Sequence, residues 1–424
     1  MILFHVMTLM FLPAAMGLAL ISLFLKNFHC HLFLRLGMAC GLGLGVITQW
    51  MLLIGSLGLP MDARFINIPL WAVTLLLAGI LFVRENENRN FCDVLRQPVE
   101  PLNFFEWIFC GIIGFYVCVV FLNALRLVPV IAWDGIATLA FKGKFFFYEQ
   151  TFAFNHLLPH PSYPLHLPFL MSWTAVTIGE WHEYFVKFFF PFYFCSLLLI
   201  CYGFLREYIP RTAALFGIVL LCFGNYLVLH AFLAYRDLPL AFYNCLTVFL
   251  IILWKVRGSE KLLILAGLFS GLAAFVKLEG YGYAVVHGIL IVCLGLMPFR
   301  SGRKDLRQTA RDILVFLIPV GILILSYALF KIHFRIPFGE PGKTELIFAS
   351  DIFQRIPVII GSFFKNMFWS TYWGWNWYLL TICVLLSLRS FSEIARGILT
   401  AMILFFASCA ALFLLTPNYH YCPN

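Results

Sequence analysis

The stretch from Trp133 to His166 holds the residues of this 424-residue chain that are best suited to chemistry. It reads WDGIATLAFKGKFFFYEQTFAFNHLLPHPSYPLH and combines acidic, basic, histidine and proline residues between two long apolar segments. Polar groups next to such apolar segments are costly unless they face water or a substrate. We therefore predict that this stretch forms a functional loop.

Two aspartates, Asp134 and Asp237, are the candidate acids. Asp134 follows the apolar sequence LVPVIAW, and Asp237 lies in YRDLPLAFYN directly after Arg236. A carboxylate near a membrane interface can act as a general base when its neighbours tune its pKa. Each aspartate also fits a helix cap. Asp134 precedes a helical run that begins at Gly135, and Asp237 precedes a helix with Pro239 in its first turn. Catalysis and capping remain alternatives at both positions.

The composition predicts that membrane helices position these residues. The chain is 62% hydrophobic and 12% charged, with a mean hydropathy of +0.92, whereas soluble domains are typically about 25% charged. The net charge of +9 does not indicate nucleic-acid binding, because the basic residues cluster in short loops, where they set membrane topology. The 13 cysteines are scattered without a CxxC pair, which favours small buried apolar residues over metal ligands.

A spanning helix needs about 20 apolar residues, so the chain is predicted to be an all-α, polytopic protein with about twelve transmembrane helices. Their approximate positions are 3–25, 32–57, 65–83, 104–124, 183–205, 212–231, 238–255, 261–276, 281–298, 312–331, 366–388 and 397–416. If these helices alternate, the Lys and Arg of the short loops fall on one side, which is predicted to be cytoplasmic. Two long loops, 125–182 and 332–365, then face away from the cytoplasm. The first is predicted to contain two interfacial helices, at 135–148 and 163–180.

The chain is predicted to comprise three regions. Residues 1–103 form N-terminal transmembrane helices, residues 104–300 form a catalytic transmembrane core with the loop 125–182, and residues 301–424 form C-terminal transmembrane helices with the loop 332–365. All the candidate chemistry lies on the extracytoplasmic side of this arrangement.

The order of the motifs resembles the GT-C superfamily of membrane glycosyltransferases. The matching features are an aspartate in a long first outer loop, a YP…P segment that opens a surface helix, the later RDLPLAFY, and a helix pair interrupted by K-x-E-G. The likeness is to the branch that holds protein O-mannosyltransferases and the lipid A aminoarabinose transferase, and it covers roughly residues 104–300. It implies the GT-C fold and transfer of a sugar from a dolichyl- or undecaprenyl-phosphate donor, with inversion at the anomeric carbon.

The resemblance also implies roles for individual residues. Asp134 would be the catalytic base or would position the acceptor, and Asp237 would be a second acid near the site. The leaving polyprenyl phosphate needs positive charge, and the candidate phosphate-binding residues are Arg236, Lys277, Lys142, Lys144 and Arg335. The candidate substrate-binding residues are Trp133, Tyr163, His166 and Glu279. Alternatively, Lys277 and Glu279 form a structural ion pair, because a lysine between two apolar helices needs a partner.

The histidines do not predict a metal centre. His156, His160, His166 and His182 are spaced through proline-rich chain and do not define one face of a helix, so no zinc site is assigned. Asp134 and Asp237 alone offer few oxygen ligands to Mg²⁺ or Mn²⁺. The cofactor is therefore predicted to be either none or a divalent cation, without assigned metal ligands.

The predicted partners are the lipid bilayer, a polyprenyl-phosphate sugar donor and a glycan, lipid or protein acceptor, without nucleic acid. The predicted location is multi-pass in a bacterial inner membrane or in the endoplasmic reticulum. A transporter or lipid flippase is the main alternative, although transporters place polar groups near the bilayer midplane, whereas here these groups gather at one face. A non-catalytic membrane assembly subunit is the third alternative.

Overall fold

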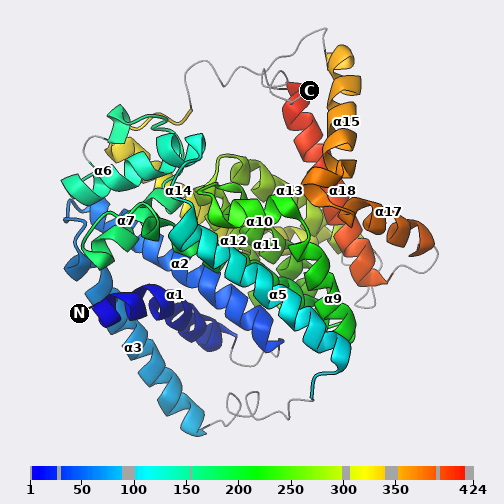
Figure 1. Cartoon of the computed structure of the whole chain (residues 1–424), viewed down its shortest axis with the longest axis horizontal. Helices are drawn as coiled ribbons and strands as arrows, with labels where there is room; N and C mark the ends of the chain where they lie inside the picture. Colours follow the sequence, from blue (N-terminus) through cyan, green and yellow to red (C-terminus); the bar gives the residue numbers. More distant parts are fainter. Residues whose placement is uncertain are drawn as a thin grey trace. The chain divides into compact units, whose positions relative to one another are not determined.

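The computed structural model describes residues 2–25, 30–87, 101–152, 155–297, 306–339, 352–387 and 392–415. All the regular secondary structure within these ranges is helical (Figure 1). The all-α class predicted from the apolar segments is therefore confirmed.

Nine helices within the described ranges are long and apolar enough to cross a membrane. They are α1 (Ile2–Phe24), α2 (Leu32–Ser56), α3 (Ala63–Glu87), α5 (Phe104–Leu122), α8 (Phe189–Arg206), α11 (Asp237–Arg257), α13 (Glu279–Leu296), α14 (Leu306–His333) and α18 (Glu393–Leu415). This architecture is that of an integral, multi-pass membrane protein.

Three of the predicted spans differ from continuous membrane helices. The segment predicted at 212–231 consists of α9 (Arg211–Cys222) and α10 (Asn225–Phe232), which are bent by 70° where Gly224, a poor helix former, lies between them. The segment at 261–276 forms α12 (Glu260–Val276), whose 17 residues rise about 26 Å, slightly less than a hydrocarbon core of about 30 Å. The segment at 366–388 contains the end of α15 (Ile352–Phe368), then α16 (Ser370–Trp373) and α17 (Asn376–Ser387).

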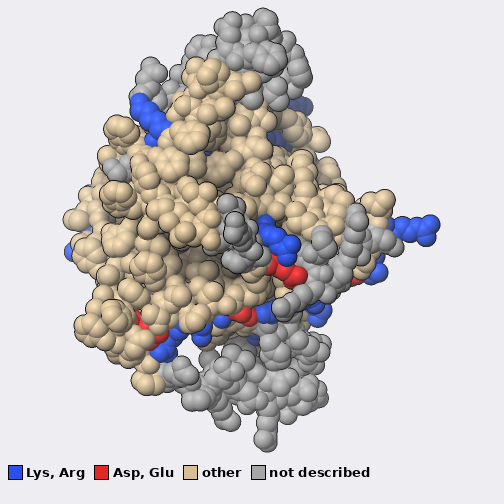
Figure 2. All heavy atoms as spheres, turned by 90° about the vertical axis from the view of Figure 1, so that its right-hand side faces the viewer, with Lys and Arg blue, Asp and Glu red and all other residues tan. Residues whose placement is uncertain are grey.

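Exposed apolar side chains cover the helices that face lipid. On α3, Leu75, Leu76 and Phe82 are exposed, and on α14, Ile318 and Ile322 are exposed. Figure 2 shows one face of the molecule, most of which carries neither acidic nor basic side chains. Such a surface suits contact with hydrocarbon, where unpaired charges are costly.

The described chain divides into two compact units. The first comprises residues 1–159, 165–222 and 227–243, and the second comprises residues 160–164, 223–226 and 244–424. The boundary along the chain thus falls within α11, whereas the three predicted regions end at residues 103 and 300. The three regions were assigned from motifs and loops, and the two units reflect packing.

In the first unit, α2 packs against α1 and α8, and α5 packs against α9 (Figure 1). The close approach of α1 to α2 requires glycine at Gly17 and Gly43, since a Cβ there would meet the carbonyl groups of Ala39 and Pro13. Small residues at helix contacts allow backbones to approach closely in membranes. The core of this unit therefore forms around α2.

Two helices do form in the loop predicted at 125–182. The first is a π-helical turn, η2 (Gly135–Ala140), that continues into α6 (Phe141–Glu149), and the second is α7 (His166–Ile178). Nearly every residue of α7 is buried, because α1, α2, α3 and α6 all pack against it. The predicted interfacial helix at 163–180 is therefore corrected to an internal helix. Its small residues Ser172, Thr174 and Ala175 let neighbours approach from several sides.

The second unit is built on the hairpin of α12 and α13, with α14 packed against both helices and α18 against α13. Gly280 at the start of α13 faces the backbone of Ala273 in α12 without room for a Cβ. Gly267 of α12 makes a similar approach to the carbonyl of Phe316 in α14. These contacts require glycine because two helix backbones nearly touch.

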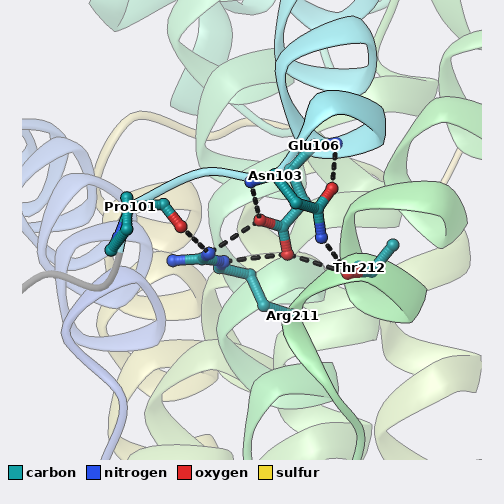
Figure 3. Close-up of polar contacts among 5 residues, drawn as sticks. All are labelled: Pro101, Asn103, Glu106, Arg211 and Thr212. Carbon is teal, nitrogen blue, oxygen red and sulfur yellow. Dashed lines mark hydrogen bonds and ion pairs between the residues drawn. The ribbon is translucent and has the colours of Figure 1, made fainter.

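A buried ionic network joins the start of α5 to the start of α9 (Figure 3). Asn103 and Glu106 form a capping box at α5. The Glu106 carboxylate accepts hydrogen bonds from Nε and Nη2 of Arg211, at 2.9 and 2.7 Å, and from Oγ1 of Thr212, at 2.8 Å. Arg211 Nη2 also donates to the carbonyl of Pro101, at 2.6 Å. Planar pairing of this kind fixes both orientation and distance.

This network is a main anchor of α5 within the first unit. The only residues of α5 that are buried within the described structure are Glu106 and Val120. Apolar packing within the protein therefore stabilises the position of α5 only weakly. The ion pair between Glu106 and Arg211 adds an attachment at the start of the helix.

Replacing Glu106 by Gln is expected to lower the thermal unfolding temperature of the purified protein in detergent. The substitution removes the negative charge of Glu106 from the largely buried Arg211 guanidinium, and breaking a buried pair from one side is strongly destabilising. Asp62→Asn is the control. The Asp62–Arg64 pair has a similar length of 2.8 Å, but the Arg64 side chain is 77% exposed and such pairs contribute little. Equal unfolding temperatures for the two variants would contradict the anchoring role.

Candidate functional site

Asp134 lies at an exposed position where an extended segment enters η2. The π-helical turn η1 (Asn123–Leu127) ends α5, and Asp134 follows seven residues later with helical backbone angles of φ −61° and ψ −37°. Its side chain makes no capping hydrogen bond, although its carbonyl accepts one from Thr138 Oγ1 at 2.5 Å. Asp134 therefore occupies the N-cap position of η2, but its side chain does not cap this helix.

Asp237 is the first residue of α11, where a negative charge interacts favourably with the helix dipole. Its Oδ2 lies 3.8 Å from Nδ1 of His230, and its side chain is 46% exposed. The His230 ring stacks on Tyr235, with centroids 4.9 Å apart. Asp237 therefore combines a favourable place at a helix start with a histidine neighbour that becomes cationic when protonated.

A buried lysine, Lys187, connects the two chain segments that lead to these aspartates. It ends η4 (Phe185–Lys187), the turn before α8. Its Nζ donates to the carbonyl of Val128 at 2.6 Å and to the carbonyl of Phe232 at 2.9 Å. Val128 belongs to the segment that reaches Asp134, and Phe232 belongs to the segment that reaches Asp237.

Two further contacts continue this alignment. Gly135 lies so close to Ala234 that a Cβ on Gly135 would be 3.0 Å from the Ala234 oxygen and 3.1 Å from its Cβ. Beyond it, Arg236 Nη2 donates to the carbonyl of Thr138 at 3.0 Å. Asp134 and Asp237 each lie next to a residue that makes one of these contacts. The structure therefore brings together the two aspartate-bearing segments of the first unit.

The other predicted residues of the first unit lie in varied environments. Trp133 is 76% exposed, Arg236 is buried, and Lys142 is fully buried in α6. Lys144 is half exposed and pairs with Glu183, with Nζ 3.3 Å from Oε1. The positive charge of Lys144 is thus already partly neutralised by a neighbouring acid.

His166 lies in the interior of the first unit and has both ring nitrogens occupied. Its Nδ1 is 2.8 Å from Thr48 Oγ1, and its Nε2 is 2.6 Å from the hydroxyl of Tyr193. The Tyr193 hydroxyl lies 3.1 Å from that of Tyr243, which donates to the carbonyl of Gly41. Burial lowers the pKa of His166 to about 3, so the ring is neutral at physiological pH. This chain of hydrogen bonds joins α2, α7, α8 and α11 in the core.

The remaining predicted residues belong to the second unit. Lys277 and Glu279 form an ion pair of 3.1 Å, which confirms the pairing weighed as an alternative to substrate binding. Tyr163 is half-buried, and its carbonyl accepts a hydrogen bond from Tyr327 at 3.1 Å. Arg335 is exposed and has a left-handed backbone, with φ at 54°.

Arg335 ends α14 in a Schellman motif. The amide of Ile336 donates to the carbonyl of Lys331 at 2.8 Å, and the amide of Arg335 donates to the carbonyl of Ile332 at 3.2 Å. The left-handed position of this motif usually holds glycine. Arginine at this position is therefore strained, which is common at binding sites.

Sequence reasoning missed Lys187, His230 and Lys331. Lys187 interrupts the apolar sequence FVKFFFPF, a signal of the same kind as the one that drew attention to Lys277. His230 precedes Asp237 by seven residues and gave no motif. Lys331, at the end of α14, is 2% exposed and donates to the carbonyl of Ser162 at 2.7 Å. Lys187 and Lys331 meet partners that are distant in the sequence, whereas His230 meets Asp237 and Tyr235 close by in the chain.

Among the residues that the structure describes, no three His, Cys, Asp or Glu side chains lie together as a possible metal site. The chain matches no protein-family model, no curated protein and no solved structure. The chemistry of the site therefore has to be inferred from its own residues.

The contact between Gly135 and Ala234 can be tested by cross-linking. The double variant Gly135→Cys/Ala234→Cys is expected to form a disulfide under mild oxidation, since the Cβ separation of 3.1 Å needs only a small shift to reach the usual range of roughly 3.5–4.5 Å. Mass spectrometry of the linked peptides is the measurement. Gly111→Cys/Ala234→Cys is the control, because Gly111 has no atom of another residue near its Cβ position. Similar yields for both pairs would contradict the alignment.

Proposed function

We propose that the protein is a glycosyltransferase of the GT-C superfamily, with about twelve membrane helices, that takes a sugar from a polyprenyl phosphate. The observation that carries the proposal is the alignment of the Asp134 segment with the Asp237 segment through Lys187, Gly135 and Arg236. The two acids come from separate segments, since Asp134 precedes η2 and Asp237 is the first residue of α11. A pair of this kind suits proton transfer and acceptor positioning. In the proposed topology the pair faces the extracytoplasmic side.

The proposed reaction is a direct displacement at the anomeric carbon. The acceptor hydroxyl oxygen forms the new bond to this carbon, and the bond from the carbon to the phosphate oxygen breaks with its electron pair. Asp134 takes the hydroxyl proton, and the polyprenyl phosphate leaves with its negative charge. Because attack and departure occur on opposite faces, the configuration inverts.

Asp134 fits the role of base better than Asp237 does. Its side chain is exposed and is used in no cap, so a hydroxyl can approach it. Asp237 already faces His230 at 3.8 Å and lies at a helix start that favours its charged form. We assign Asp237 to orienting the acceptor or the sugar.

In the second unit, Arg335 is the predicted cation best suited to bind a phosphate group. Lys144 and Lys277 are paired with acids, and Lys142 and Arg236 are buried. Arg335 is exposed and forms no ion pair within the described residues. Its guanidinium can bind two phosphate oxygens at once.

Some members of the superfamily use a divalent cation. In this chain the described residues provide no cluster of three acidic or histidine ligands, and Mg²⁺ and Mn²⁺ prefer several oxygen ligands. The residues do not fit such an ion, and no step is assigned to it.

A transporter or lipid flippase is the second candidate. It is favoured by the 70° bend between α9 and α10, because broken helices commonly form the substrate sites of transporters. Sugar transfer to an added acceptor separates the two proposals, since a flippase moves the lipid across vesicles without cleaving the sugar–phosphate bond.

Asp134→Asn is expected to lower the turnover number about 10²- to 10⁴-fold, the usual contribution of a general base. The measurement is transfer from a radiolabelled polyprenyl-phosphate sugar in reconstituted vesicles. Asp62→Asn is the control, because Asp62 is engaged by Arg64 in a separate exposed turn. Full activity of Asp134→Asn would show that Asp134 is not the base.

Arg335→Gly is expected to stabilise the protein by about 1 kcal/mol, since glycine adopts the left-handed backbone without strain. The same substitution should raise the KM for the donor about tenfold, through loss of a charged hydrogen bond. The control is Gln150→Gly, which also replaces a left-handed residue, with φ at 51°, at the end of α6. It should stabilise the fold and leave KM unchanged. An unchanged KM in Arg335→Gly would remove Arg335 from the donor site.

A further inference from the structure

Lys187 is a fully buried cation whose hydrogen-bond partners are two main-chain carbonyls. Within the part of the chain that the structure describes, no Asp or Glu forms an ion pair with it. An ammonium group in such surroundings is costly unless negative charge is provided in another form.

Two helix ends provide this negative charge. Val128 directly follows η1, which continues α5, and Phe232 is the last residue of α10. The last carbonyls of a helix lack partners within it, and each helix C-terminus carries roughly half a negative charge. Two such ends together balance about one ammonium. Lys187 therefore donates hydrogen bonds to the carbonyls at two helix ends, and the partial negative charges of these ends offset its positive charge.

Both helix ends lead directly to the candidate acids. Asp134 follows Val128 by six residues, and Asp237 follows Phe232 by five residues. The two segments both bind the Lys187 ammonium, and they are in contact a second time where Gly135 lies against Ala234. The distance between the two acids therefore depends on how Lys187 joins the two segments that carry them.

We infer that Lys187 is a positioning residue that holds the Asp134 and Asp237 segments in register by joining the C-terminal ends of two helices. Its effect on sugar transfer rests on the proposed function, whereas the alignment itself rests on the two hydrogen bonds. Lys187 acts through the acids and touches no substrate in this role.

The test introduces Lys187→Met into the Gly135→Cys/Ala234→Cys protein and measures the initial rate of disulfide formation. The rate is expected to fall at least about tenfold, because loss of one charged hydrogen bond corresponds to about tenfold and the substitution removes two. Lys331→Met is the matched control, since Lys331 is also a buried lysine that donates to a carbonyl, that of Ser162, but it is bonded to neither aspartate segment. The control should keep the parental rate. An unchanged rate in Lys187→Met, or an equal fall in both variants, would overturn the inference.

Lys187→Gln provides a second variant if the methionine protein does not fold. Glutamine keeps amide donors but loses the charge and some reach, so slower cross-linking is again expected, and the parental rate would overturn the inference. Lys187→Arg keeps the charge and several donors and should restore most of the rate. No rescue by arginine together with a parental rate for glutamine would assign Lys187 to packing alone.

Sugar transfer gives an independent readout. Lys187→Met should lower the turnover number with little change in the KM for the donor, because the acids lose their register while the phosphate contacts remain. A raised KM with an unchanged turnover number would contradict the positioning role. If the unmodified protein transfers no sugar from a polyprenyl-phosphate donor, the proposed function fails, and the cross-linking rates still decide the role of Lys187.

Discussion

The arrangement of the candidate site depends on one buried ammonium group that lies between two helix ends. Without the Lys187 bonds to Val128 and Phe232, two partly buried main-chain carbonyls would lose the ammonium donor, and unsatisfied backbone groups are costly in a membrane. The same bonds place the segments of Asp134 and Asp237 side by side. The same two hydrogen bonds therefore satisfy the backbone carbonyls and place the two acids.

Two other buried polar groups of the first unit follow the same rule, because each is paired within the fold. Glu106 is held by Arg211 and Thr212, and His166 is held by Thr48 and Tyr193. Exposed polar groups differ, since Asp134 and Arg335 lie at the ends of helical segments and are accessible. This division separates groups that stabilise the helices from groups that can meet a substrate.

The structure adds detail to one prediction from hydropathy and corrects another. The span predicted at 212–231 is formed by two helices bent by 70°, and the helix predicted to be interfacial at 163–180 is buried on nearly all sides. Hydropathy reports how apolar a segment is, and it does not distinguish lipid from protein as the surroundings. The burial of the small residues of α7 and the bend at Gly224 are seen only in the folded structure.

The sequence by itself determined the all-α class, the membrane location of most helices and the two aspartates as the residues to examine. These properties follow from local composition, since about 20 consecutive apolar residues suffice for a membrane helix, and an acid at the start of such a helix is conspicuous. Only the tertiary structure decided that Asp134 and Asp237 lie on joined segments, because Lys187 is 59 residues from Val128 and 45 from Phe232. Such contacts depend on how helices pack, and no local pattern encodes them. For the same reason, the sequence could name Lys142 and Lys144 as cations, but burial and the pairing with Glu183 arise from the fold alone.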